Sequence, residues 1–114
     1  MAAYEELYAM LRRAVADKLQ VAARYQGCDR EFCPHAIGWA KDGTARVLGY
    51  QFGGKSPGEL AEDGSPDNWR CFDINGLRLV QVRTGEWHTA PTHQAIRGRC
   101  LHQIDDVGMT VSGL

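Results

Sequence analysis

The sequence lacks any long uninterrupted apolar run. The first twenty residues already contain five charged side chains, at Glu5, Glu6, Arg12, Arg13 and Asp17. A secretory signal needs a continuous apolar region, so this stretch is not expected to direct export. No other stretch approaches the length that spans a membrane. We therefore expect a cytoplasmic protein with no membrane partner.

A surplus of charge is also absent. The 13 basic and 14 acidic residues give a formal net charge of −1, which provides no general attraction to nucleic acid or anionic lipid. Any site for an anion must therefore be local. Ten of the 13 basic residues are arginine, whose forked guanidinium group suits phosphate and carboxylate contacts.

Paired metal-binding clusters of cysteine and histidine are missing. The four cysteines are Cys28, Cys33, Cys71 and Cys100. Without an export signal, we expect reduced thiols rather than disulfides. Cys28, Cys33 and His35 offer three metal ligands, but their spacing and the lack of a second cluster make a weak zinc signature. The sequence predicts buried thiols and neither a metal nor another cofactor.

The low-hydropathy, highly charged composition of disordered chains is absent as well. Hydrophobic residues make up 44% of the chain and charged residues 24%, as in globular proteins. A chain of 114 residues is long enough to bury a core of its own. We predict one domain over residues 1–114.

The sequence does contain two clear hydrophobic periodicities. Helical spacing over residues 4–16 predicts an amphipathic helix whose apolar stripe is Tyr4, Leu7, Tyr8, Leu11, Ala14 and Val15. A period of two over residues 19–26 predicts a half-buried strand, with one face formed by Leu19, Val21, Ala23 and Tyr25. Further extended segments cover residues 30–40, 44–52, 68–74 and 77–83.

Turn signals divide these strands. Asp42-Gly43 and Asn75-Gly76 each predict a two-residue hairpin between the segments on either side. Pro34 cannot donate a ladder hydrogen bond, so it marks an edge or a bulge. Thr84-Gly85 predicts a turn into a short strand at residues 86–89, and residues 100–111 contain a candidate last strand.

Residues 53–67 predict a long loop, because eight of these fifteen positions are Gly, Pro or Ser. Such a loop is too long for a hairpin, so it is either a functional flap or disordered. Short strands joined by hairpins predict an α+β fold that is mainly β. The N-terminal helix would pack on a strongly bent antiparallel sheet or a small SH3-like or Sm-like barrel.

Two stretches match the residue pattern of a catalytic motif, but their neighbouring residues do not allow the structure that the motif needs. Residues 49–56 fit the phosphate-loop pattern, yet Pro57 and Gly58 follow where a helix must continue. Residues 54–58 fit the G-x-S-x-G elbow, whose oxyanion hole needs the amide N–H of the residue after the serine. Pro57 has no such group.

Cys33 and His35 are a third catalytic candidate, as nucleophile and base. Two residues apart on a strand, they lie about 6.5 to 7 Å apart along the backbone, too far for the required hydrogen bond. We therefore predict no catalytic residues and no enzymatic activity. A nucleotide hydrolase that uses the loop at residues 53–58 is kept as the last alternative.

Arg70 shares a strand face with Phe72 and Ile74, so its guanidinium projects from the side that faces the core. Such an arginine either lays its stem along the core and reaches water at the barrel rim, or meets an anionic ligand at the barrel mouth. Residues 69–104 also hold five arginines against two acidic residues. Three aromatic residues are candidates to stack on bases, namely Tyr50, Trp69 and Trp87.

The order of these features resembles that of a known family, the WYL domain. After the helix come, in order, Val21-x-x-x-Tyr25-x-Gly27, Arg30-x-x-Cys33-Pro34, a hairpin, Leu48-Gly49-Tyr50, a variable loop, Arg70-x-Phe72-x-Ile74, Leu77 and Val80. The match runs from about Leu11 to Trp87. The tripeptide that names the family falls on Arg46-Val47-Leu48 and keeps only the leucine. The second arginine of the later stretch falls on Gly76, with Arg78 close by.

The resemblance implies a strongly bent sheet of the Sm or SH3 kind, used for ligand sensing in bacterial regulators and phage-defence proteins. It further implies nucleic-acid or nucleotide-like ligands held by basic and aromatic residues. Family members usually also carry a DNA-reading helix-turn-helix. A single helix cannot supply that motif, so a separate regulator is the expected partner.

We therefore predict a non-enzymatic ligand-sensing module that binds a short single-stranded nucleic acid or a nucleotide-like anion. The predicted ligand-binding residues are Arg70, Tyr50, Arg46 and Arg78. The alternative is a protein-interaction or homodimerisation module in which the arginines serve only packing and solubility.

Overall fold

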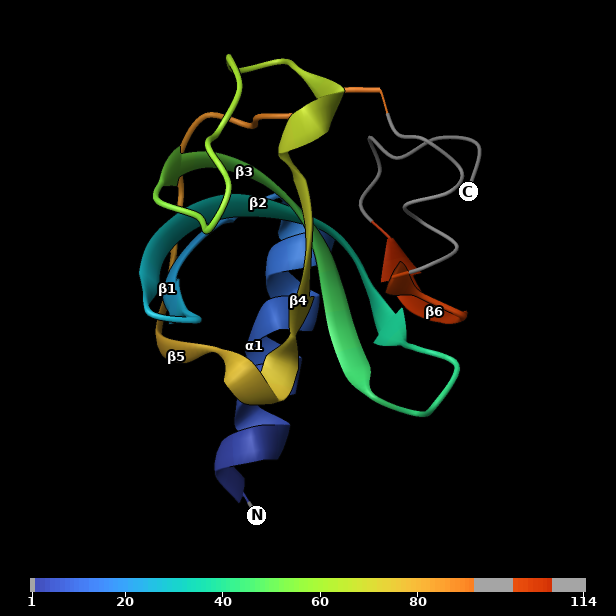
Figure 1. Cartoon of the computed structure of the whole chain (residues 1–114). Coiled ribbons are helices and arrows are strands. Elements are labelled where there is room, and N and C mark those ends of the chain that lie inside the picture. The colour runs from blue at the N-terminus through green and yellow to red at the C-terminus, as the bar shows by residue number, and fades with distance from the viewer. Residues whose placement is uncertain (1, 92–99, 108–114) are drawn as a thin grey trace.

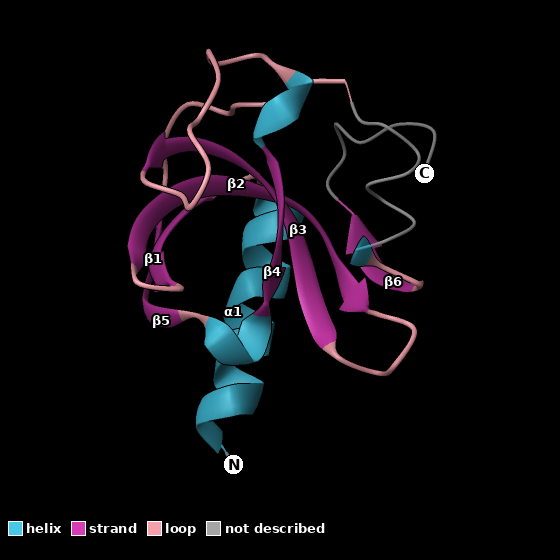
Figure 2. Cartoon of the chain, viewed as in Figure 1, coloured by secondary structure: helices cyan, strands magenta, loops and turns pink. Residues whose placement is uncertain are grey.

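The structure is a computed structural model that describes residues 2–91 and 100–107. One helix packs on a six-stranded antiparallel sheet, so the fold is α+β and mainly β, as predicted (Figures 1 and 2). The elements are α1 (Ala2–Asp17), β1 (Gln20–Tyr25), β2 (Cys28–Trp39), β3 (Ala45–Gly54), β4 (Trp69–Asp73), β5 (Arg78–Arg83) and β6 (Gln103–Val107), with short 3-10 helices at Pro66–Asn68 and Ile74–Gly76. The strand order is β4-β3-β2-β1-β5, and β6 pairs with β2.

Helix α1 forms where the apolar stripe predicts it. Leu11, Ala14 and Val15 are completely buried against the sheet. The helix ends because Lys18 takes a left-handed φ of 55°, and the amide of Leu19 then donates to the carbonyl of Ala14 at 2.9 Å. This is the hydrogen-bond pattern of a Schellman cap, which satisfies a carbonyl that the helix leaves open.

Strands β1 and β2 form a tight hairpin. Gln26 and Gly27 have φ of 51° and 77°, the left-handed pair that a two-residue type I′ turn requires. Tyr25 and Cys28 form the last pair of the ladder, so β2 begins two residues earlier than the predicted segment. The predicted inner face of β1 is confirmed, since Val21, Ala23 and Tyr25 are all buried in the core.

Strand β2 is long enough to take part in three pairings. It pairs with β3 along most of its length, with β1 through its first half and with β6 through its second half. The register with β3 shifts between Pro34 and Ala36, which confirms the bulge predicted at the proline. Both long strands curve strongly across the molecule in Figure 1. The bend lets one sheet wrap around a core.

The hairpin predicted at Asp42-Gly43 does join β2 to β3. Its loop has three residues rather than two, because the amide of Ala40 donates to the carbonyl of Thr44 at 2.8 Å. Gly43 takes a φ of 90°, which favours glycine. The Asp42 carboxylate accepts from the Thr44 amide at 3.0 Å and holds the turn.

The hairpin predicted at Asn75-Gly76 is wrong. Strand β4 pairs with β3, and β5 pairs with β1, so the two strands on either side of this dipeptide do not pair with each other. Neither Asn75 nor Gly76 has a positive φ, whereas a type I′ turn needs one at both positions. The chain instead makes a 3-10 turn at Ile74–Gly76, which carries it from one end of the strand order to the other.

The strand predicted at residues 86–89 does not form, and residues 84–91 contain no regular element. This segment is held by side chains rather than by a ladder. The Gln20 amide donates to the carbonyl of Glu86 at 2.6 Å, and the amide of His88 lies 3.3 Å from the Cys33 sulfur. The last strand, β6, lies within the predicted range of 100–111, of which residues 108–111 lie outside the described part of the chain.

The buried residues form two clusters. The larger lies between α1 and the sheet, where the rings of Phe32 and Phe72 stack at 4.3 Å and Tyr25 meets Phe72 edge-on at 5.1 Å. The smaller cluster contains Leu48 and Tyr50 of β3, which alternate with the residues of β3 that face the larger core. Ala36, Trp69, Cys100 and Leu101 complete it.

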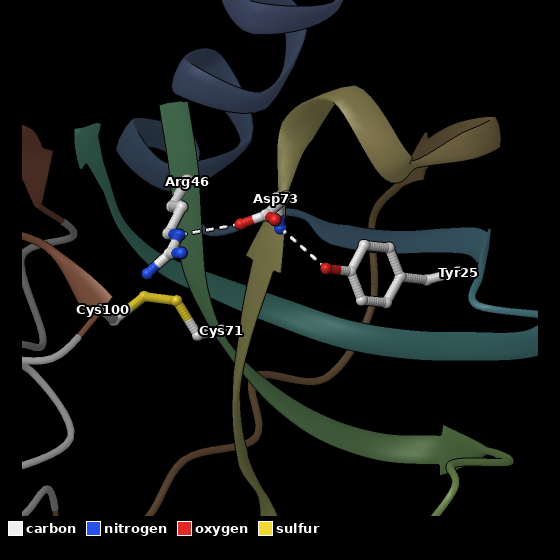
Figure 3. The surroundings of a disulfide bond; sticks show 5 residues. All are labelled: Tyr25, Arg46, Cys71, Asp73 and Cys100. Atoms are coloured by element: carbon white, nitrogen blue, oxygen red, sulfur yellow. Dashed lines mark hydrogen bonds and ion pairs between the residues drawn. A yellow bond between two sulfur atoms is a disulfide. The ribbon is translucent and has the colours of Figure 1, made fainter. Parts of the chain in front are cut away.

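The expectation of reduced thiols throughout is wrong, because Cys71 and Cys100 form a disulfide (Figure 3). It joins the middle of β4 to the residues just before β6, which are 29 positions apart, with a Cα–Cα distance of 5.7 Å. Cys28 and Cys33 are free cysteines. Disulfides are typical of oxidising compartments, so the cysteines no longer support a cytoplasmic location. In the described residues, no helix is both long and apolar enough to cross a membrane.

Candidate anion-binding site

A cavity of about 340 Å³ opens between the β1–β2 hairpin, the loop residues 56–58 and residues 70–72 of β4. Two arginines line it, Arg30 from β2 and Arg70 from β4. These strands are not neighbours in the sheet, since β3 lies between them. Both arginines reach the same cavity because the sheet is strongly curved.

Arg30 is the unusual residue of this cavity, since only 3% of it is exposed. Its Nη1 donates to the Oε1 of Gln51 at 3.2 Å. Its guanidinium carbon lies 5.3 Å from the ring centre of Tyr25 and 5.7 Å from that of Phe72, within the range of cation–π attraction. These contacts fix the plane of the guanidinium group.

Two donors of Arg30 have no partner. Nε and Nη2 are buried, and neither makes a hydrogen bond within the described part of the chain. The N–H bonds of these two atoms point the same way, which is the fork that grips two oxygens of one carboxylate or phosphate group. Burying charged donors without a partner costs free energy.

Gln51 holds the fork in place. This side chain is completely buried, and its oxygen accepts from Arg30 while its nitrogen donates to the carbonyls of Gly53 and Lys55 at 3.0 and 2.9 Å. Gln51 is not among the residues predicted for the site. The signal that could have identified it is a glutamine on the same strand face as Ala45 and Val47, since a buried amide needs partners.

Arg70 contributes the second positive charge. Its Nη1 donates to the carbonyls of Asp67 and Trp69 at 2.7 and 3.1 Å, and its Nη2 lies 3.4 Å from the hydroxyl of Ser56. Burial lowers the pKa of Arg70 and the charge of Arg30 lowers it further, whereas the charge of Asp67 opposes the shift. An arginine still remains protonated, so two like charges face one cavity.

None of the described residues that line this cavity is Asp or Glu. The segments outside the description, residue 1, residues 92–99 and residues 108–114, contain neither residue type. The local charge that Arg30 and Arg70 supply is therefore available to a ligand.

Of the four predicted ligand-binding residues, only Arg70 lines the cavity. Arg46 forms an ion pair with Asp73 at 2.7 Å (Figure 3). Arg78 donates to the carbonyls of Asn75 and Leu77. The ring of Tyr50 is completely buried and does not face solvent, where a base would stack. The binding roles of Arg46, Arg78 and Tyr50 stay predictions, and these three residues do not line the cavity.

Tyr50 instead anchors the long loop. The Tyr50 hydroxyl donates to the carbonyl of Ser65 at 2.8 Å and accepts from the amide of Gly64 at 2.7 Å. Both partners lie in the loop that reaches over β3. The predicted flap is therefore tied to the smaller core cluster.

We expect Tyr50→Phe to destabilise the protein by about 1 to 2 kcal/mol, because it leaves loop groups without their buried partner. The loop at residues 55–65 should also become more sensitive to limited proteolysis. Chemical denaturation and a time course of cleavage measure the two effects. Tyr8→Phe removes an exposed hydroxyl that bonds Asp105 and serves as the control. Equal cleavage rates in both variants would contradict the anchoring role.

Within the described part of the chain, the catalytic and metal motifs do not assemble into sites. Residues 55–65 form no helix, so the geometry of a phosphate loop is not present. His35 lies 2.8 Å from the backbone oxygen of Cys33 rather than from its thiol, and burial raises the pKa of that thiol to about 11. Within the described residues, no three His, Cys, Asp or Glu side chains gather as metal ligands.

Comparisons with models of protein families, with curated proteins and with solved structures found no match to this chain. The similarity to WYL domains therefore stays a hypothesis that rests on the motifs quoted above. The small, β-rich fold is consistent with an SH3-like or Sm-like form.

Proposed function

We propose that this chain is a non-enzymatic sensing module that binds a nucleotide-like anion or a short single-stranded nucleic acid in the cavity between Arg30 and Arg70. The observation that carries the proposal is a cavity lined by two arginines, Arg30 and Arg70, and by no acidic side chain among the described residues. A cleft lined by charges of one sign attracts ligands of the opposite sign.

Size and lining support a ligand of this class. A volume of about 340 Å³ falls in the range of small-molecule sites and exceeds what a simple inorganic anion fills. Tyr25 and Phe72 give the cavity apolar walls, while Ser56 and the two arginines supply polar contacts. This combination suits a molecule with an anionic group and a flat or apolar remainder.

A direct test is titration of the protein with AMP and with a single-stranded pentanucleotide at low salt, followed by calorimetry and thermal unfolding. Binding should stabilise the fold, by about 2.7 kcal/mol at a ligand concentration of 100 times Kd. Arg30→Gln should weaken binding by at least about 30-fold, because truncating a buried charge contact costs about 2 to 5 kcal/mol.

Arg24→Gln is the matched control, because Arg24 is an exposed arginine on the neighbouring strand that pairs with Asp29. This variant should bind like the wild type. The proposal fails if neither ligand binds at low salt, or if Arg30→Gln binds as tightly as Arg24→Gln. Circular dichroism of each variant verifies that the fold is retained.

A protein-interaction or homodimerisation module is the second candidate, and one observation favours it. Leu79 is 81% exposed on β5, at one end of the strand order, and takes a left-handed φ of 54° that a leucine rarely adopts. A stable dimer in sedimentation experiments that Leu79→Asp dissociates, together with no nucleotide binding, would favour this role.

A further inference from the structure

We infer that the cavity between Arg30 and Arg70 holds its ligand by the nucleobase as well as by the anionic group, because the main chain of Cys71 presents a donor and an acceptor to the edge of the base. This inference rests on the proposed function and extends it to the uncharged part of the ligand. It follows from where the cavity lies on β4 and from how little of that strand edge is open.

The cavity lies along the edge of β4 that faces away from β3. It touches three consecutive residues of this strand, Arg70, Cys71 and Phe72, although neighbouring side chains of a strand point to opposite faces. Contact with all three therefore involves the edge of the strand rather than one face. Strand β3 occupies the other edge, and no strand of the described sheet pairs with this one.

The main-chain groups of Cys71 are directed to this open edge. In an antiparallel pair, the N–H and C=O of every second residue bond the partner strand, and those of the residues between face away from it. The amide of Asp73 donates to the hydroxyl of Tyr25 at 3.0 Å, so Asp73 faces away from β3. Cys71, two positions earlier, has the same orientation. Tyr25 also lines the cavity, and Figure 3 shows it on one side of β4 with the disulfide on the other.

The open edge is only one residue long. On one side of Cys71, the amide of Asp73 is bonded to Tyr25. On the other side, the carbonyl of Trp69 accepts from Nη1 of Arg70 at 3.1 Å. A peptide that adds to a sheet as a strand uses several consecutive main-chain groups. A nucleobase needs only one donor beside one acceptor, which it carries on its own edge. The edge of β4 therefore suits a base better than a peptide.

Positive charge lies beside this edge. Arg70 precedes Cys71 in the chain and lines the same cavity as Arg30, with no Asp or Glu among the described lining residues. The cavity thus combines a positive field with a main-chain donor and acceptor. A nucleotide is a small molecule that carries both matching parts, an anionic group and a hydrogen-bonding base.

The first test changes only the ligand. Calorimetry at low salt compares AMP with ribose 5-phosphate, which has no base, and with AMP whose exocyclic amine carries two methyl groups and no longer donates. Two hydrogen bonds to the base should make AMP bind about tenfold more tightly than either of the other two. Equal affinities of the three would overturn the inference. A pentanucleotide of adenosine that binds more tightly than AMP assigns a strand as ligand, and the reverse order assigns a free nucleotide.

The second test removes the donor from the protein. Cys71→Pro/Cys100→Ser lacks the outward N–H, which the ladder with β3 does not use. Cys71→Ser/Cys100→Ser lacks the same disulfide but keeps this N–H, so it is the matched reference. Loss of one of the two hydrogen bonds should lower the preference for AMP over ribose 5-phosphate about threefold between the two variants. Circular dichroism verifies that both fold, and an unchanged preference would contradict the role of Cys71.

The outcomes separate this inference from the proposed function. If AMP and ribose 5-phosphate bind equally and Arg30→Gln weakens both, the proposed function stands and this inference fails. If no nucleotide, sugar phosphate or strand binds, both fail. A blocked hexapeptide of alternating Glu and Val that binds more tightly than AMP, and that the proline variant binds more weakly, would replace the base by an added peptide strand.

Discussion

Loss of the Cys71–Cys100 disulfide is expected to lower the free energy of unfolding by about 3 to 4 kcal/mol. The bond closes a loop whose ends are 29 positions apart, and a loop of this length restricts the unfolded chain by roughly that amount. It also fastens β4, which lies at one end of the strand order and pairs with β3 alone in the described sheet.

The double variant Cys71→Ser/Cys100→Ser measures this effect in urea denaturation without reductant. Cys28→Ser is the control, since Cys28 is a free and partly exposed cysteine on the same chain. A reducing agent should shift the midpoint of the wild type and leave that of the double variant unchanged. Coincident midpoints for all three proteins without reductant would show that no disulfide forms between these cysteines.

Acidification is expected to destabilise the protein through His35, by about 3 kcal/mol between pH 7 and pH 4. His35 is buried between the rings of Trp69 and Trp87, and burial lowers its pKa from 6.5 to about 4. Its ring is held in the neutral form, with Nδ1 donating to the carbonyl of Cys33 and Nε2 accepting from the hydroxyl of Thr89 at 3.0 Å.

The direction of this pH effect follows from the protonation of His35 in the folded and unfolded states. Between pH 6.5 and pH 4 the unfolded chain carries a proton on His35 and the folded protein does not, so the free energy of unfolding falls as the pH falls through this window. Carboxylates also contribute to the change of the unfolding free energy with pH. Their contribution cancels when a variant is compared with the wild type.

His35→Gln should flatten the plot of unfolding free energy against pH, whatever its stability at pH 7. His102→Gln changes an exposed histidine and should keep the wild-type slope. Denaturant titrations at half-unit pH intervals supply the plot. Identical slopes for the three proteins would show that His35 is not held neutral by its surroundings.

The helix and five of the six strands could be predicted from the sequence to within about two residues, because their signals are local. The alternation of Val21, Ala23 and Tyr25 in β1 depends only on which face of one strand is buried. The same holds for the bulge at Pro34, where the missing N–H belongs to the residue itself.

The errors lie where distant segments decide the local structure. Asn75-Gly76 is compatible with a hairpin, but β5 pairs with the distant strand β1, and the dipeptide makes a corner instead. The segment at residues 86–89 reads as a strand, yet the side chains of Gln20 and Cys33 take up its backbone groups. The pairing of Cys71 with Cys100 likewise exists only in the folded chain.

Only one of the two arginines of the candidate site could be predicted from the sequence. Arg70 was found because its strand face is readable from Phe72. Arg30 was not singled out as a ligand-binding residue because nothing near it in sequence shows that it is buried. Its burial comes from two aromatic rings on other strands and from the amide of Gln51.

Gln51 has a consequence for how this protein can change. One end of its amide steadies the guanidinium group of Arg30 deep in the molecule, and the other end secures the backbone from which a surface loop departs. A substitution that shortens this side chain removes both contacts at once. Natural variation of that kind would therefore change the surroundings of a buried charge and the outer contour of the protein together.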